Sequence, residues 1–183
     1  MIITISGKQG AGKTTVAEGL SKALGYDFIS VGDLQGEIAI DRRITINELM
    51  ELGKTDRSIY IEMDKKTVEL GEIKDNFIID GWIAFHFIPS AYKIFLDVDE
   101  NVGAKRIFTS IRKDEQKAKT LEETKQRLKS RLSDVQESFK KYYDLDFLDH
   151  SHQDLVIDTT NLTIQKVIGK ILDKIKDEKE KNI

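Results

Sequence analysis

The sequence predicts an α/β fold in which helices cover both faces of a parallel sheet. Five short β-rich runs alternate with helical patterns along the chain, at residues 1–6, 27–31, 77–80, 91–98 and 155–159. Several of these runs are continuously apolar rather than alternating in polarity, which is typical of parallel strands that crossover helices bury on both faces. The chain has 183 residues, of which 39% are hydrophobic, so we expect one domain rather than two.

Capping residues mark the starts of several predicted helices. A helix-forming stretch, residues 14–24, follows the first β-rich run. Thr45 with Glu48, and Thr120 with Glu123, have the spacing of capping boxes. Thr163 precedes an apolar stripe at helical spacing, which we expect to pack in the core. The stripe consists of Ile164, Val167, Ile168, Ile171, Leu172 and Ile175.

The strongest functional pattern is GKQGAGKT at residues 7–14, which satisfies the phosphate-binding pattern GxxxxGK[ST] between a predicted strand and a predicted helix. Glycines permit positive φ and remove side chains, so backbone N–H groups can surround phosphate oxygens at the positive end of the helix. Lys13 is expected to contact the β and γ phosphates, and Thr14 to bind Mg²⁺. A glycine-rich turn without a ligand is the alternative. The residues predicted to bind the triphosphate are Gly7, Lys8, Gln9, Gly10, Ala11, Gly12, Lys13, Thr14 and Thr15.

Asp80 ends the third predicted strand, FIID, on the side of the sheet where ligands of parallel α/β proteins bind. Its carboxylate can hold a Mg²⁺-bound water, so Thr14 and Asp80 form the predicted metal site. Alternatively, Asp80 only begins a turn with Gly81. Trp82, the next residue, can stack on a base or fill the core.

One basic segment stands out in an acidic chain. Residues 105–141 carry 12 Lys and Arg against 6 Asp and Glu, whereas the whole chain has a net charge of −3. Arg127 and Arg131 are four residues apart and therefore share one helix face. With Arg106 and Arg112, they are candidates to close over a transferred phosphoryl group as a cationic lid. The alternative is an ordinary solvated helix face.

Composition excludes several other functions. The chain has no cysteine, which rules out disulfides, thiolate catalysis and cysteine-ligated zinc sites. The longest apolar runs are strand-sized, and no basic leader with a cleavage site precedes them, so we expect a cytoplasmic protein without a membrane partner. The negative total charge argues against binding to nucleic acid polymers. We expect a monomer.

Five motifs together resemble the P-loop nucleoside monophosphate kinases, and within them the archaeal type of cytidylate kinase. They are GKQGAGKTT at residues 7–15, SVGD at 30–33, FLDVDENVGAKRI at 95–107, LEETKQR at 121–127 and DLVIDTTNLTIQKV at 154–167. The resemblance implies the P-loop NTPase fold with a five-stranded parallel sheet. It also implies an acceptor-binding insertion at about residues 32–70 and a lid at about residues 112–149. The implied reaction transfers the γ-phosphoryl group of ATP to CMP or dCMP with Mg²⁺.

The resemblance also assigns residues to the two substrates. It adds Arg106 to the ATP site and makes Lys13, Arg112, and Arg127 or Arg131 catalytic, because the motifs fit two registers of the lid helix. On the acceptor side it implies Gly32, Asp33, Asp80 and Gly81, and we add Trp82 because its ring can stack on a base.

Two acceptor-clamping arginines of similar archaeal enzymes are replaced here by Gly36 and Trp82. Arg57 is the candidate replacement, with Arg42 and Arg43 in the same insertion. The alternative is that each of them is a solvated surface group. These departures keep two alternatives open. One is a P-loop kinase for another small acceptor, and the other is an ATP-binding module without turnover.

Overall fold

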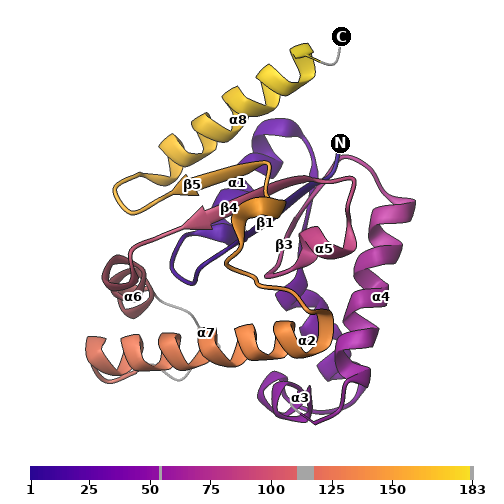
Figure 1. Ribbon diagram of the computed structural model, residues 1–183, viewed down its shortest axis with the longest axis vertical. Coiled ribbons are helices and arrows are strands. Elements are labelled where there is room, and N and C mark those ends of the chain that lie inside the picture. The colour runs from indigo at the N-terminus through magenta and orange to yellow at the C-terminus, as the bar shows by residue number, and fades with distance from the viewer. Residues whose placement is uncertain (54, 111–117, 182–183) are drawn as a thin grey trace.

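A computed structural model describes residues 1–53, 55–110 and 118–181 of the chain (Figure 1). The predicted five-stranded parallel sheet is confirmed, with the strand order β2-β3-β1-β4-β5. The strands are β1 (Ile3–Gly7), β2 (Asp27–Ser30), β3 (Phe77–Asp80), β4 (Tyr92–Asp97) and β5 (Leu155–Asp158). Each lies within one or two residues of the predicted run. The fold class inferred from the sequence is therefore correct.

Helices account for most of the remaining described chain. They are α1 (Lys13–Leu24), α2 (Val31–Asp41), α3 (Ile46–Gly53), α4 (Ser58–Ile73), α5 (Ala84–Phe87), α6 (Glu100–Thr109), α7 (Leu121–Tyr143) and α8 (Ile164–Lys181), with a short 3₁₀ turn at His150–His152. None of the described helices combines the length and the apolarity needed to cross a bilayer.

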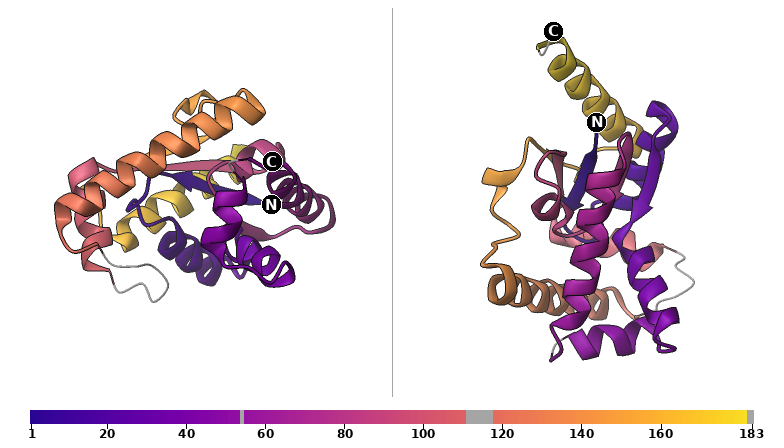
Figure 2. Two further views of the ribbon diagram at one scale, coloured as in Figure 1. Left: turned by 90° about the horizontal axis from the view of Figure 1, so that it is seen from below. Right: turned by 90° about the vertical axis from the view of Figure 1, so that its right-hand side faces the viewer.

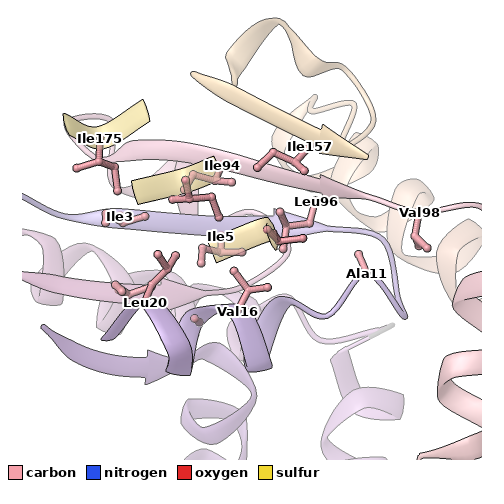
Figure 3. Close-up of a cluster of buried hydrophobic side chains, with 14 residues drawn as sticks. Ile3, Ile5, Ala11, Val16, Leu20, Ile94, Leu96, Val98, Ile157 and Ile175 are labelled. Carbon is pink, nitrogen blue, oxygen red and sulfur yellow. The ribbon is translucent and has the colours of Figure 1, made fainter. Parts of the chain in front are cut away.

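The core lies on both faces of the sheet, because alternate residues of the buried strands point to opposite sides. Ile3 and Ile5 of β1 pack against α1 and α8, as Figure 3 shows. The predicted stripe of α8 is confirmed as core, since Val167, Ile171 and Ile175 are buried there. On the opposite face, Ile79 belongs to a second cluster that includes Ala84 of α5.

Local capping fixes the helix starts that the sequence predicted. The Thr45 hydroxyl accepts a hydrogen bond from the Glu48 N–H, and the Glu48 carboxylate accepts one from the Thr45 N–H, which completes a capping box. At the start of α7, Thr120 accepts from the Glu123 N–H, but the Glu123 carboxylate accepts from the Lys119 N–H instead of the Thr120 N–H. Both helices therefore begin where the capping pattern indicates.

The segments outside the βα alternation gather at one end of the molecule. Helices α2, α3 and α7 lie at the end opposite the C-terminal part of α8 (Figures 1 and 2). Ile38, Leu49 and Ile59 form a small core that joins α2, α3 and α4. The residues predicted to form an acceptor insertion therefore pack around a core of their own.

Candidate active site

The phosphate loop connects β1 to α1 in a shape that glycine makes possible. Gly10 and Gly12 have φ values of 80° and 91°, which side chains rarely tolerate. A Cβ on Gly10 would also lie 2.4 Å from the carbonyl oxygen of Gly103 in α6, so the loop and this helix approach each other backbone to backbone. Helix α1 begins directly after Gly12. The loop therefore has the form of an anion-binding concavity at a helix N-terminus.

Lys13 folds back over this loop. Its ammonium nitrogen Nζ donates hydrogen bonds to the carbonyl oxygens of Gly7 and Lys8, at 2.8 Å and 3.0 Å. The Lys8 side chain instead forms an ion pair with Asp97 at the end of β4, at 2.7 Å. Of the two lysines in the loop, Lys13 is thus the one whose charge lies over the concavity.

Thr14 and Asp80 are 66 residues apart in sequence and meet at the start of α1. The Thr14 hydroxyl donates a 2.6 Å hydrogen bond to the Asp80 carboxylate. Asp80 is buried at the end of β3, where Ile5 of β1 is its neighbour in the sheet. A hydroxyl and a carboxylate oxygen form the kind of donor set that a small hard cation such as Mg²⁺ prefers. The two residues predicted to form the metal site therefore fit such an ion chemically.

Two cavities meet at the phosphate loop. The larger, about 520 Å³, is bounded by the loop, by Arg106 of α6 and by the start of α8. The smaller, about 200 Å³, lies between the end of β3 and helices α2, α4 and α7. Three side chains line both cavities, namely Lys13, Trp82 and Arg131. A group held at this boundary could be passed from a ligand in one cavity to a ligand in the other.

The comparisons with known proteins agree with this arrangement. Residues 2–161 match the model of the cytidylate kinase-like family. The chain belongs to the cytidylate kinase-like family. A cytidylate kinase of Methanosphaera stadtmanae is 31% identical over 179 residues, which cover 98% of this chain and 100% of that protein. One of Methanocella arvoryzae is 35% identical over 179 residues, with coverages of 96% and 99%.

A third relative is much longer. An S-adenosylmethionine-dependent nucleotide dehydratase of Lacinutrix mariniflava is 34% identical over 173 residues, which cover 93% of this chain and 35% of that protein. This chain thus spans about a third of that relative's length.

Solved structures share the fold. The chain resembles a shikimate kinase of Aquifex aeolicus with a TM-score of 0.60 at 20% identity, covering 97% of this chain and 98% of that one. It also resembles an uncharacterized protein of Eubacterium ventriosum with a TM-score of 0.72 at 18% identity, covering 96% and 98%.

In this member of the cytidylate kinase-like family, the two candidate lid arginines have different surroundings. Arg131 lines both cavities. Arg127 lies one turn earlier, and its guanidinium donates a 2.6 Å hydrogen bond to the Glu123 carboxylate. Arg112 lies outside the described residues. Of the two candidates, Arg131 is the one that lines both cavities, and the catalytic role of either arginine stays a prediction.

Arg106 connects the phosphate loop to the segment after β5. Its guanidinium donates to the Gly10 carbonyl at 3.3 Å, and to the carbonyl oxygens of Thr159 and Thr160 at 2.8 Å and 3.2 Å. It also lines the larger cavity. Arg106 therefore fixes the position of the loop as well as forming a cavity wall.

The predicted acceptor residues divide into two groups. Gly32, Asp80, Gly81 and Trp82 line the smaller cavity. Asp33 and Arg57 are exposed and are not among the lining residues of that cavity. The Arg57 guanidinium donates to the Tyr142 carbonyl at 3.3 Å, and so connects the start of α4 to the end of α7. Substrate contacts by Asp33 and Arg57 stay predictions.

The smaller cavity also contains an acidic residue that is not among the predicted site residues. Asp64 of α4 lines this cavity, is partly buried, and accepts a 2.8 Å hydrogen bond from the Tyr143 hydroxyl of α7. Burial raises the pKa of the Asp64 carboxyl to about 6, although the Tyr143 hydrogen bond and the nearby Arg57 charge act in the opposite direction. Spacing could have revealed it, because Tyr60, Asp64 and the buried Thr67 share one face of α4.

Proposed function

We propose that this protein is a nucleoside monophosphate kinase that transfers the γ-phosphoryl group of ATP to CMP or dCMP. The observation that carries the proposal is the pair of cavities that share Lys13, Trp82 and Arg131. A kinase needs a donor and an acceptor site that meet where the phosphoryl group moves, with positive charge at that point. The cytidylate kinase-like family and the archaeal relatives named cytidylate kinase support CMP as the first acceptor to test.

The donor side of the proposal uses the larger cavity. ATP would place its phosphates in the concavity at residues 7–14, with Lys13 against the β and γ phosphates. Thr14 would bind Mg²⁺ directly and Asp80 through a water. Bound Mg²⁺ would neutralise charge on the phosphates. Arg106 would hold the loop in place and border the nucleotide.

The acceptor side uses the smaller cavity. We propose that residues 32–70 are the acceptor-binding insertion and that residues 112–149 are the lid, within one kinase domain. Arg131 would bring positive charge from the lid helix to the transferred group. Catalysis of phosphoryl transfer requires positioning and charge neutralisation more than covalent chemistry by the protein. Arg131 and Lys13, which line both cavities, meet that requirement.

The deciding experiment measures ADP release from ATP with each of CMP, dCMP, UMP, AMP and GMP, using the purified protein and Mg²⁺. We expect CMP or dCMP to give the highest kcat/KM, and the Lys13→Ala variant to lose most of this turnover. ATP binding in calorimetry without turnover of any monophosphate would refute the proposal and favour an ATP-binding module. Turnover only with a different hydroxyl or phosphate compound would favour the other kinase class.

The dehydratase relative does not change this proposal. Its aligned part is about a third of its length, and this third corresponds to the kinase-like chain described here. We therefore propose no dehydration reaction for this chain. We further propose that the protein acts as a monomer without a nucleic acid partner, which size-exclusion chromatography coupled to light scattering would test.

A further inference from the structure

The smaller cavity has chemically different ends. Near the phosphate loop, Lys13 and Arg131 contribute positive charge. Away from the loop, the walls come from α4, α5 and α7 and include the rings of Tyr60, Phe87 and Tyr143. An anionic group fits the first end and a flat ring fits the second.

Asp64 is the acidic side chain in the wall formed by α4. Among the residues that the structure describes, its carboxylate has one hydrogen-bond partner, the Tyr143 hydroxyl at 2.8 Å, and no ion-pair partner. The Arg57 charge lies near enough to lower the pKa of this carboxyl, but the effect of burial outweighs it. A partly buried carboxylate is costly unless further donors satisfy it. A ligand with an N–H donor would supply the missing hydrogen bond.

The orientation of Asp64 is fixed from the lid helix. The Tyr143 ring lies among other aromatic rings, with the centroids of Phe87 and His86 at 5.5 Å and 5.9 Å. Its hydroxyl therefore reaches Asp64 from a packed side chain. Two neighbouring hydroxyls are engaged within their own helices, since Thr67 donates to the Met63 carbonyl and Ser138 donates to the Asp134 carbonyl. Asp64 is thus a preoriented acceptor in this wall.

We propose that Asp64 selects the base of the acceptor nucleotide by accepting a hydrogen bond from the exocyclic amino group of cytosine. The inference rests on the proposed monophosphate kinase function and specifies the part of the substrate that this wall contacts. Cytosine has an amino donor at position 4, whereas uracil has a carbonyl there, whose lone pairs would face the carboxylate oxygen. Polar groups that a wrong ligand leaves unpaired are a strong source of discrimination.

The test compares kcat/KM for CMP and UMP in the wild-type protein and in Asp64→Asn. An amide presents either an N–H or a carbonyl, so it can pair with both bases. We expect the wild type to prefer CMP, and the CMP to UMP ratio of kcat/KM to fall about tenfold or more in Asp64→Asn. Glu69→Gln is the matched control, because Glu69 is exposed on the same helix and its substitution removes the same charge without touching the cavity.

A second variant tests whether the Tyr143 hydroxyl orients the Asp64 carboxylate. Tyr143→Phe removes only the hydroxyl that contacts Asp64, and we expect it to lower the same ratio severalfold by raising KM for CMP more than it lowers kcat. An unchanged ratio in both variants, with CMP still phosphorylated, would overturn the role of Asp64 and leave the kinase function standing. A wild-type preference for UMP would also overturn it. Absence of turnover with every monophosphate would refute the kinase proposal itself, and the base-selection role with it.

Discussion

The Lys13 ammonium lies over the indole ring of Trp82, with its nitrogen Nζ 5.3 Å from the ring centroid. Both side chains line the larger and the smaller cavity. The indole also packs against Phe147, with the two ring centroids 5.0 Å apart. Trp82 therefore fills part of the core and also forms part of the cavity wall, and stacking of its ring on a base stays a prediction. Beside this ring, Lys13 and Arg131 supply the positive charge that lines both cavities.

Trp82→Ala should reduce both stability and activity. Removing the indole opens a cavity against Phe147 and deletes the ring over which Lys13 lies, at a cost of about 2 kcal/mol in the free energy of unfolding for a partly buried aromatic side chain. Urea denaturation and steady-state kinetics measure the two effects. Trp82→Phe, which keeps an aromatic ring, should retain most of both. A stable and fully active alanine variant would show that the ring contributes neither packing nor positioning.

Lys13→Ala should lower kcat/KM for the ATP-dependent reaction by about 10² to 10³, the cost typical of losing one preorganised charge at a transition state. Lys8→Ala is the comparison within the same loop. It should have a much smaller effect, because the Lys8 side chain pairs with Asp97 instead of reaching over the loop. Similar losses in both variants would mean that loop stability, and not the Lys13 charge, limits the reaction.

Arg131→Ala and Arg127→Ala should separate the two lid registers. Arg131 lines both cavities, so its loss should cost about 10³ in kcat if it contacts the transferred group. Arg127 pairs with Glu123 on an exposed turn, and such pairs contribute less than about 1 kcal/mol. We expect its removal to change kcat less than about threefold. The opposite ranking would assign the catalytic role to Arg127.

Local sequence signals were sufficient for much of the fold. Short β-rich runs, several of them continuously apolar, identified the five strands, and the Thr45 and Thr120 caps identified two helix starts. Each of these signals is carried by residues close together in the chain. The phosphate loop was predictable for the same reason. Its residue types specify a backbone shape independently of what packs around it.

The residues of the smaller cavity could not all be predicted from the sequence, because their environment depends on tertiary packing that no local pattern encodes. Asp64 acquires its environment from Tyr143, which is 79 residues away in sequence. The lid register was ambiguous because Arg127 and Arg131 share a helix face four residues apart. What distinguishes them is the neighbourhood of Arg131, where Leu128 lines the larger cavity and Leu132 packs on the aromatic cluster around Phe147. Only tertiary structure supplies that information.

Asp80→Asn should raise the Mg²⁺ concentration needed for half-maximal activity by about tenfold, the scale typical of losing a residue that orients a metal's ligands. The amide can still accept the hydrogen bond from the Thr14 hydroxyl, so the fold of the loop should survive. Circular dichroism would verify this, and a Mg²⁺ titration of the activity gives the shift. If the titration curve did not move, Asp80 would act only as a structural partner of Thr14.

Protonation of Asp64 should make stability depend on pH in a defined direction. Burial raises the carboxyl pKa from 3.8 to about 6 in the folded protein, so between about pH 4 and pH 6 the folded state binds more protons than the unfolded state. The free energy of unfolding therefore loses a contribution from this group as pH rises through that window. Because the side chain is only partly buried, solvent screening reduces the loss to about 1 kcal/mol.

Asp64→Asn removes the titrating group while keeping an acceptor for Tyr143. Relative to the wild type, this variant should therefore gain about 1 kcal/mol of stability between pH 4 and pH 7.5. Urea denaturation at both pH values measures the difference. For the Glu69→Gln control, the difference from the wild type in the free energy of unfolding should be nearly the same at the two pH values, because the Glu69 side chain is exposed in the folded protein. If the Asp64→Asn difference were equally flat, the carboxyl would be solvated in the folded protein, and the acceptor cavity would be more open at this wall than its geometry indicates.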